Sequence, residues 1–201
     1  IARERVALPH YFAALAVHAG EAAGFVSGLN SETKPFLPAF EIIKMRPGFK
    51  RASSVFVMAW EDRVWFYADC SMNIAPDAAN LAESGRATAQ SARAFGHEPR
   101  VAFLSFSTRD SAKDASIDRV KEAVAMVRAA EPGLVVDGEM QFDAAMLPEV
   151  ARKKCPDSPL AGGANVFVFP DLNSGNIAYK ITERIGGARA IGPIFQGLNQ
   201  P

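Results

Sequence analysis

The sequence predicts an α/β protein, a three-layer sandwich in which helices cover both faces of a largely parallel, mixed sheet. Short β-rich runs alternate with helical patterns along the chain, the order typical of parallel strands joined by crossover helices. The runs 55–58 and 64–67 are separated only by a short polar segment. That spacing indicates a hairpin, so part of the sheet is expected to be antiparallel. Apolar residues make up 49% and charged residues 22% of the 201 residues, which excludes a disordered chain.

The first elements of the chain are predicted by short helical and β-rich patterns. Residues 8–18 have a helical pattern, and 24–26 form a short β-rich run. Residues 38–45 are expected to form a helix that carries a proline at an early position, where a missing N–H costs little. The hairpin over 55–58 and 64–67 then follows.

The longest helix is expected over 77–95, because Asp77 is a suitable N-cap and Gly96 a suitable terminator. Residues 101–106 read as a buried strand. Apolar residues between 117 and 127 recur at helical spacing, which predicts the next helix.

The last third of the chain continues the alternation. Strands are expected over 134–136, 165–169 and 190–191, and helices over 143–153 and 174–184. The second of these strand and helix pairs leads directly into the final strand, as a βαβ order requires.

Charge and cysteine content exclude several classes of protein. Lys+Arg and Asp+Glu both number 22, whereas a general nucleic-acid binder needs a basic face. Cys70 and Cys155 are far apart, so neither a disulfide framework nor a zinc site is indicated, and a reducing cytoplasm is the expected location. No apolar run approaches the length of a membrane span, and no signal peptide is visible. The chain starts at Ile1 without a methionine, and we expect it to be a fragment.

Small polar clusters follow five of the expected strands, and three of the clusters contain glycine. Because ligands of open α/β sheets bind at the carboxyl ends of strands, these clusters are the candidate site. Helix caps and turns favour the same residues for local reasons, and that alternative stays open. The clusters occupy 69–73, 105–108, 137–143, 170–176 and 192–199.

Two of the clusters suggest chemistry. The segment 173–176 opens a helix, whose free N–H groups and positive dipole end suit an anion, although simple capping is the favoured interpretation. Asp137, Glu139 and Asp143 are three carboxylates that could supply a base or hold a metal, but their spacing matches no metal motif and structural roles are the alternative. Cys70 lacks a cationic neighbour in sequence, which favours a buried thiol over a nucleophile.

Several long blocks resemble the phosphate acetyltransferases (phosphotransacetylases), in order and over nearly the whole chain. The block "DGEMQFDAAMLPEVARKKCPDSPLAGGANVFVFPDLNSGNIAYK" contains the two most specific segments, Gln141–Asp143 and Phe169–Asn176, and the last block along the chain is "AIGPIFQGLNQP". Further blocks are "FYADCSMNIAPDAANLAE", "FGHEPRVAFLSFST", "YFAALAVHAGEAAGFVSG" and "PAFEIIKMRPG".

The resemblance implies reversible transfer of an acetyl group between CoA and inorganic phosphate, as part of acetate metabolism. It implies direct attack of the CoA thiolate on the acetyl carbonyl, which is catalysis by approximation and charge stabilisation. It also implies a fold related to the isocitrate/isopropylmalate dehydrogenases, with two domains around an interdomain cleft, and a homodimer. The expected division is a partial first domain over 1–43, a second domain over 44–190 and a return segment over 191–201.

The sequence departs from the family pattern in two places. The family's "QGLNxP" segment continues into the catalytic Ser-Arg motif and a carboxylate base, and this chain stops at Pro201 before them. The phosphate-holding arginine of the family aligns with Leu37, where nearby Lys34 lacks the planar guanidinium. These departures keep two alternatives open: a non-catalytic acyl-CoA-sensing domain, like the C-terminal domain of some malic enzymes, and a butyryl- or propionyl-transferring relative.

We assign no catalytic role to any residue present. No cofactor or metal is expected, and CoA, acetyl phosphate and phosphate are the expected ligands, with neither nucleic acid nor membrane as a partner. The candidate residues for binding CoA or substrate, of which 107–108 and 173–176 are the strongest, are Ser31, Thr33, Asp69, Asn73, Ser105, Ser107, Thr108, Asp143, Asn173, Gly175, Asn176 and Gln196.

Overall fold

The structure is a computed structural model and describes residues 2–28 and 41–200. The chain forms two compact units, residues 1–52 with 197–201, and residues 53–196. The resemblance places the crossings at 43/44 and 190/191. The chain crosses later at both points, because strand β1 (Ser53–Ala59) begins the central sheet and strand β6 (Arg189–Gln196) pairs with it along its length.

The smaller unit contains helices α1 (Ala2–Val6) and α2 (Pro9–His18), and α2 confirms the helix expected there. The expected strand at 24–26 is wrong, since these residues have no strand partner among the described residues. The helix expected to reach residue 45 ends at Ile43, and Met45 instead forms a bridge with Leu198. Its beginning lies outside the described residues.

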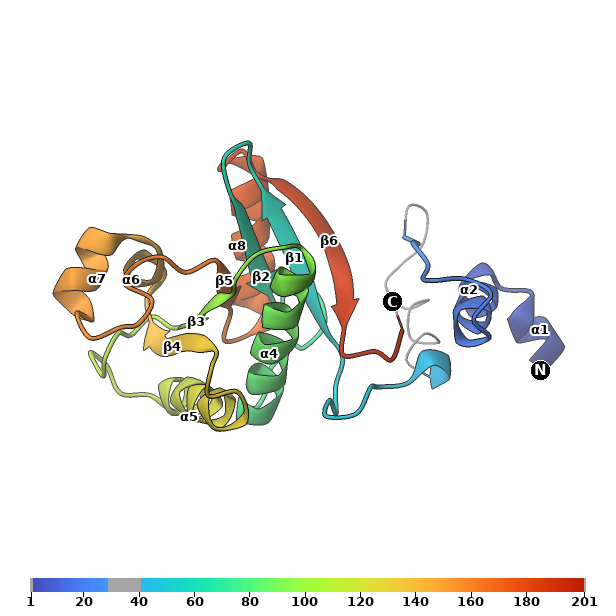
Figure 1. The fold of residues 1–201 in the computed structure, drawn as a ribbon, viewed down its shortest axis with the longest axis horizontal. Helices are drawn as coiled ribbons and strands as arrows, with labels where there is room; N and C mark the ends of the chain where they lie inside the picture. Colours follow the sequence, from blue (N-terminus) through green and yellow to red (C-terminus); the bar gives the residue numbers. More distant parts are fainter. Residues whose placement is uncertain (1, 29–40, 201) are drawn as a thin grey trace. The chain divides into compact units, whose positions relative to one another are not determined.

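The larger unit is built on a six-stranded mixed sheet with the order β4-β3-β5-β2-β1-β6 (Figure 1). Strands β2 (Val64–Ala68), β5 (Val166–Val168), β3 (Arg100–Leu104) and β4 (Val135–Met140) are parallel neighbours. The pairs β1/β2 and β1/β6 are antiparallel, which confirms the hairpin and the mixed sheet.

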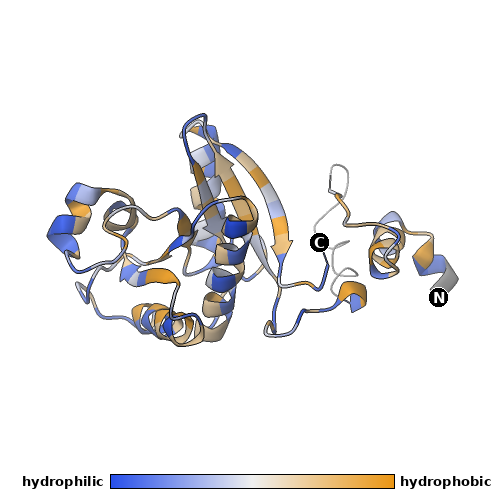
Figure 2. Cartoon of the chain, viewed as in Figure 1, coloured by the Kyte–Doolittle hydropathy of each residue, from blue (hydrophilic) through white to orange (hydrophobic). Residues whose placement is uncertain are grey.

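Helices cover both faces of this sheet, so the three-layer arrangement is confirmed (Figure 1). Helices α4 (Ala78–Ala94) and α5 (Ala115–Ala130) bury their apolar sides against one face. Helices α6 (Phe142–Met146), α7 (Pro148–Lys154) and α8 (Leu172–Arg184) lie on the other. Figure 2 shows the hydrophobic residues along the strands between these layers.

A capping side chain and a proline explain two of the observed helix boundaries. The Asp77 side chain caps α4 by accepting from the Asn80 N–H at 2.8 Å, as expected. The single helix expected over 143–153 is split into α6 and α7, because Leu147 precedes Pro148 and adopts an extended conformation, which proline imposes on the residue before it.

Two strands continue several residues beyond the C-terminal ends that the sequence predicts. Strand β4 continues through Asp137 and Glu139 to Met140. Both side chains are buried. The strand tolerates them because each carboxylate accepts hydrogen bonds. Strand β6 continues past Ile191 to Gln196 and contains Pro193, which an edge strand tolerates because the missing N–H faces no partner.

Helix α4 lies very close to strand β3 because it carries a glycine at the contact. A Cβ atom at Gly85 would lie 2.5 Å from Cζ of the buried Phe103 ring. In an exposed helix Gly→Ala stabilises by about 1 kcal/mol. We predict that Gly85→Ala instead destabilises the protein by roughly 1–3 kcal/mol through overpacking, measured by urea unfolding.

Gly133→Ala is the matched control, since a Cβ there meets nothing within 4 Å. It should leave the free energy of unfolding unchanged or raise it slightly. A Gly85→Ala protein as stable as the control would show that the helix can move off the sheet without cost.

Candidate functional site

The polar clusters lie at one end of the strands, which is called the carboxyl edge of the sheet here. Strands β2, β3, β4 and β5 are parallel, so their carboxyl ends share that edge. Strand β6 is antiparallel to β1, which is antiparallel to β2, so β6 ends there too. Residues 69–73, 105–111, 141–143 and 170–176 therefore leave the sheet on the same side, the usual ligand side of such sheets.

The carboxylate of Asp69 organises the loop after β2. It is buried and accepts from the backbone N–H groups of Ser71 (3.1 Å), Met72 (3.2 Å) and Asn73 (3.1 Å). It also accepts from the Asn73 amide at 2.6 Å and from the Ser54 hydroxyl. The predicted site residues Asp69 and Asn73 are thus brought together, and the carboxylate is fully used in holding this loop.

The start of helix α8 lies directly on the same loop. A Cβ at Gly175 would come within 2.5 Å of the Asp69 carbonyl oxygen, so only glycine fits there. The Asn176 amide donates to the Cys70 carbonyl at 3.1 Å. The helix begins earlier than expected, because Asp171 is its N-cap and accepts from the Ser174 N–H at 2.8 Å. Gly175 and Asn176 therefore position the loops, while Asn173 on the first turn is exposed.

A second polar group lies after β3, around the buried carboxylate of Glu139. The Ser107 hydroxyl donates to Glu139 at 3.0 Å and accepts from the Ala112 N–H at 3.2 Å. The Asp110 N–H donates to the same carboxylate oxygen at 2.8 Å. The Ser105 hydroxyl accepts from the Ser107 N–H at 3.2 Å. Ser107 is therefore buried inside its loop, and Glu139 is the residue that fixes the loop's shape.

Thr108 connects this loop to the end of β4. Its hydroxyl oxygen accepts from the Gln141 N–H at 2.9 Å. The Lys154 ammonium donates to Gln141 Oε1 at 2.7 Å and to the Asp143 carboxylate at 3.0 Å. The hydrogen bond from Lys154 lowers the pKa of Asp143 below its usual value. Thr108 and Asp143 are thus joined through Gln141 and Lys154.

Gln196 is the predicted site residue that points elsewhere. Its side chain is buried against helix α4, where Oε1 accepts from Thr88 at 3.0 Å and Nε2 donates to Ser91 at 2.7 Å. Ser53 completes this set at 3.2 Å. Gln196 therefore joins β6 to α4 on the face opposite Asp69. The predicted residues Ser31 and Thr33, like Leu37, lie outside the described residues.

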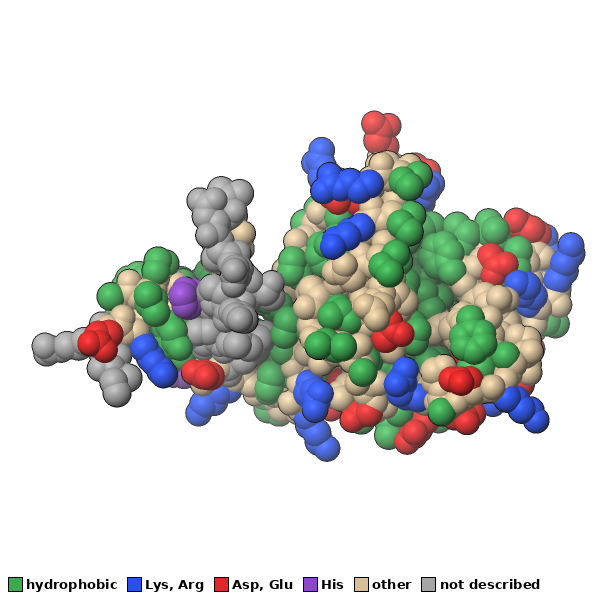
Figure 3. Space-filling view, turned by 180° about the vertical axis from the view of Figure 1, so that it is seen from behind, with side chains coloured by type: hydrophobic (Ala, Val, Ile, Leu, Met, Phe, Trp, Pro, Cys, Tyr) green, Lys and Arg blue, Asp and Glu red, His purple; other side chains and the backbone are tan. Residues whose placement is uncertain are grey.

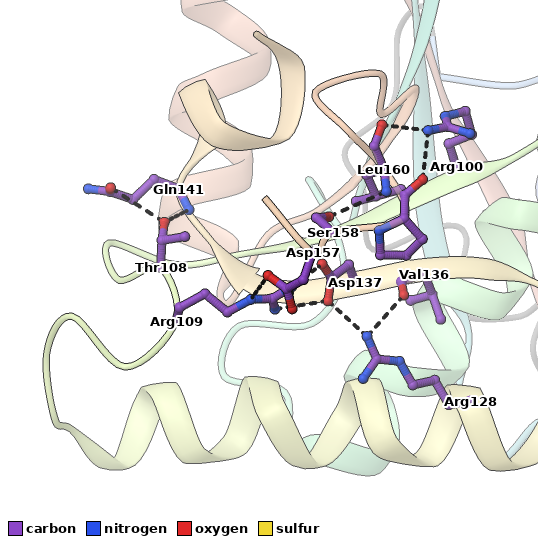
Figure 4. A network of polar contacts seen from close by, with 11 residues as sticks. Arg100, Thr108, Arg109, Arg128, Val136, Asp137, Gln141, Asp157, Ser158 and Leu160 are labelled. Atoms are coloured by element: carbon purple, nitrogen blue, oxygen red, sulfur yellow. Dashed lines mark hydrogen bonds and ion pairs between the residues drawn. The ribbon is translucent and has the colours of Figure 1, made fainter. Parts of the chain in front are cut away.

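The sequence singled out Asp137, with a structural role as one interpretation, but did not reveal its arginine partners. The fully buried Asp137 binds the Arg109 guanidinium through both carboxylate oxygens, at 3.1 and 2.8 Å, and accepts from Arg128 at 2.8 Å (Figure 4). Arg109 also contacts Asp157 at 3.2 Å. Burial raises the pKa of Asp137, but hydrogen bonds from Arg109 and Ser158 outweigh it, so the net pKa is lowered. Asp137 is a structural anchor for loop 105–111.

Neither cysteine has the lowered pKa that a nucleophilic thiol needs. Burial raises the pKa of the Cys70 thiol far above its usual value, and the nearby Asp69 charge adds to this. Burial likewise raises the pKa of Cys155. Both thiols are therefore protonated near neutral pH, as the sequence indicated for Cys70. Among the described residues, no group of three or more His, Cys, Asp or Glu side chains is arranged to hold a metal ion.

Comparison with known proteins gives one consistent family. The sequence model of the family described as "Phosphate acetyl/butaryl transferase" matches residues 1–201. Phosphate acetyltransferase of Bacillus subtilis (strain 168) is 49% identical over 201 residues, 100% of this chain and 62% of that protein. Phosphate acetyltransferase of Corynebacterium glutamicum is 48% identical, over 100% of this chain and 61% of that protein. The chain therefore spans about three fifths of the length of these relatives.

Solved structures agree with the sequence relatives. A phosphotransacetylase from Streptococcus pyogenes has a TM-score of 0.92 and 49% identity, covering 96% of this chain and 59% of that one. The EutD phosphotransacetylase from Staphylococcus aureus has a TM-score of 0.90 and 46% identity, covering 96% and 60%. A branched-chain phosphotransacylase from Enterococcus faecalis V583 is more distant, with a TM-score of 0.81 and 26% identity over 96% of this chain and 70% of that one.

The Asp137 anchor makes a prediction about stability. Asp137→Asn removes the charge shared by two guanidinium groups, both partly exposed, so solvent offsets part of the loss. We predict destabilisation by roughly 2 kcal/mol at neutral pH, measured by urea unfolding. Because the pKa of Asp137 is lowered in the folded protein, its contribution is present above about pH 4 and fades as the pH falls through the folded-state pKa. The difference between the two proteins should shrink accordingly.

Asp62→Asn serves as the control, because Asp62 pairs with Arg63 on the exposed hairpin turn. It should change stability by less than about 0.5 kcal/mol. Equal stability of the Asp137→Asn and Asp62→Asn proteins at neutral pH would contradict the role given to Asp137.

Proposed function

The chain belongs to the phosphate acetyl/butaryl transferase family, and from that membership we propose that the protein carrying it is a phosphate acetyltransferase. The reaction is the reversible transfer of an acetyl group between CoA and inorganic phosphate. The main support for this proposal is sequence identity. Over its whole length the chain is 49% and 48% identical to two relatives named phosphate acetyltransferase. These relatives do not favour the acyl-CoA-sensing alternative.

The loops at the carboxyl edge of the sheet are proposed to bind the ligands. CoA and acetyl phosphate both carry phosphate groups, and the first turn of α8 offers the positive end of a helix dipole. Asn173 is exposed on that turn, while Asp69, Gly175 and Asn176 fix its place relative to the β2 loop. In this proposal Asn173 contacts a phosphate oxygen, and the buried residues beneath it hold the geometry.

The other described candidates play supporting roles in this proposal. Asp69 and Asn73 keep the β2 loop closed, and Glu139 with Ser107 fixes the β3 loop. Thr108 ties that loop to Asp143 through Gln141 and Lys154. In this proposal these residues hold the ligand and the reacting groups close together in the right orientation, which is catalysis by approximation. The acid–base and Ser-Arg groups are those that the resemblance places after Pro201.

Several finer expectations from the resemblance stay proposals. They are a homodimer, a cytoplasmic location, a role in acetate metabolism, and a fold related to the isocitrate/isopropylmalate dehydrogenases with an interdomain cleft. The two free, buried cysteines support the proposed cytoplasmic location. Within the part of the chain that the structure describes, no helix is both long and apolar enough to cross a bilayer.

The activity itself is tested on the complete protein. We expect acetyl phosphate to form from acetyl-CoA and phosphate, with propionyl-CoA and butyryl-CoA turned over more slowly. The measurement is release of free CoA thiol together with formation of the acyl phosphate. Faster turnover of butyryl-CoA would favour the butyryl-transferring alternative. No turnover of any donor by folded protein that still binds acetyl-CoA would indicate the sensing alternative.

The place of the ligand is tested by Asn173→Ala in the complete protein. Losing one hydrogen bond to a charged phosphate should raise the KM for CoA roughly tenfold, with little change in unfolding temperature because Asn173 is exposed. Asp62→Asn, on the β1–β2 turn at the opposite edge of the sheet, should leave KM unchanged. An unchanged KM for CoA, acetyl phosphate and phosphate in Asn173→Ala would place the ligands away from this turn.

A further inference from the structure

Arg119 on helix α5 has hydrogen-bond donors that the rest of the described chain does not use. Its side chain is partly buried, and its Nε atom is buried without a hydrogen-bond partner. Among the described residues, its guanidinium makes one hydrogen bond, from Nη2 to the Pro170 carbonyl oxygen, and this bond is long at 3.4 Å. A guanidinium carries five N–H donors, and buried donors are normally paired. Arg119 therefore has donors for an acceptor from outside the described residues.

Two other arginines beside this sheet have partners that use their charge. Asp137 holds Arg109 at 2.8 Å and Arg128 at 2.8 Å. Within the described ranges, by contrast, no carboxylate forms an ion pair with Arg119. A guanidinium that is not neutralised by a nearby acid keeps its full attraction for an anion. Of these three arginines, Arg119 is the one that can still offer its charge to a ligand.

The acid at the N-cap of α5 does not take this role. The Asp114 carboxylate accepts from the N–H and the hydroxyl of Ser116, at 2.8 and 2.6 Å. These hydrogen bonds are the main reason that the pKa of Asp114 is lowered, and the charge of Arg119 adds to the effect without an ion pair. Asp114 is therefore engaged in capping the helix, and the donors of Arg119 stay unused by it.

The contact with Pro170 places Arg119 at the part of the carboxyl edge where ligands are expected. Strands β3 and β5 are parallel neighbours in the sheet. The chain leaves β3 toward α5 on one face and leaves β5 toward α8 on the other. Open α/β sheets bind ligands where neighbouring connections part to opposite faces in this way. Arg119 spans that point, because it reaches from α5 to the residue directly before the N-cap of α8.

A phosphate group is the anion that such a side chain fits. The planar set of N–H groups in a guanidinium matches the oxygens of a phosphate. Lys+Arg and Asp+Glu both number 22, and Figure 3 shows Lys and Arg side chains lying among Asp and Glu side chains on the face that it presents. The overall charge of the protein therefore does not attract phosphate. Individual guanidinium groups without a carboxylate partner have to do so.

We propose that Arg119 is a phosphate-binding residue of this protein, and that its guanidinium pairs with a phosphate group of a bound substrate beside the start of helix α8. The inference rests on the proposed function for the identity of the substrates, each of which carries phosphate. It adds a positive charge to the exposed Asn173 amide, which supplies hydrogen bonds but no charge.

The test uses the complete protein and measures binding separately from turnover. Inorganic phosphate and CoA are each titrated, and binding is read from the shift of the urea unfolding midpoint. Arg119→Gln removes hydrogen bonds to a charged group, so binding of the contacted ligand should weaken roughly ten- to a hundredfold. The KM for that ligand should rise by a similar factor. The midpoint without ligand should stay unchanged, because the one hydrogen bond of the side chain is long.

Two further variants complete the series. Arg119→Lys keeps the charge but loses the planar array of donors, so it should weaken binding less than Arg119→Gln does. Arg93→Gln is the matched control, because Arg93 lies in the last turn of α4, in the same helix layer but at the opposite edge of the sheet, and is 43% exposed. It should leave binding and KM unchanged. If Arg119→Gln does not fold, Arg119→Lys decides the question by the same measurements.

The choice of substrate shows which phosphate is bound. A rise in KM for phosphate and acetyl phosphate alone would assign Arg119 to the transferred phosphate, and a rise for CoA and acetyl-CoA alone would assign it to a phosphate of CoA. Unchanged binding and KM for all four would overturn the inference, as would a complete protein that binds neither phosphate nor CoA. A protein that transfers no acetyl group, but whose ligand binding is weakened by Arg119→Gln, would contradict the proposed function and leave this inference standing.

Discussion

The candidate site depends on the contact between the start of helix α8 and the loop that follows β2. The buried Asp69 carboxylate gathers the N–H groups of that loop into one hub, and Gly175 removes the Cβ that would hold the helix away from it. A charged group at this depth is costly unless its hydrogen bonds are made. The loop therefore has one conformation in which the carboxylate is satisfied, and the helix is seated on that conformation.

Buried carboxylates of strand β4 impose a similar constraint on the loop after β3. Asp137 is held between Arg109 and Arg128, and Glu139 receives Ser107 and the Asp110 N–H. Both acids lie within strand β4, so the loop is attached directly to the sheet. Rigid support beneath loops is what catalysis by approximation needs, because small displacements of reacting groups reduce the rate strongly.

The sequence predicts those features that depend on neighbouring residues. The β1–β2 hairpin and the Asp77-capped helix α4 are set by local patterns, and both are confirmed. The strand expected at 24–26 fails because an apolar run needs a partner strand, which a pattern does not reveal. The sequence pattern predicts one helix across Pro148, and the structure has two. The restriction that proline places on the preceding residue is nevertheless a local effect.

The sequence predicts the location of the candidate site better than it predicts the contacts between the residues there. Polar clusters after parallel strands do share one edge, which follows from topology. The roles of single residues could not be predicted, because the partners of Asp137 are 28 and 9 residues away in sequence. Gln196 shows the same limit: its position after a β-rich run suggested a ligand, but the strand continues and turns the side chain toward α4.

The strands that open and close the larger unit are hydrogen-bonded neighbours, with Ser53 opposite Gln196. The ends of residues 53–196 are therefore adjacent in space, as in units that tolerate insertion and circular permutation. The chain enters and leaves this unit at almost the same point. The segments before and after it therefore do not have to span a gap. The architecture thus lets a complete α/β layer structure be carried within another polypeptide without disturbing the order of its strands.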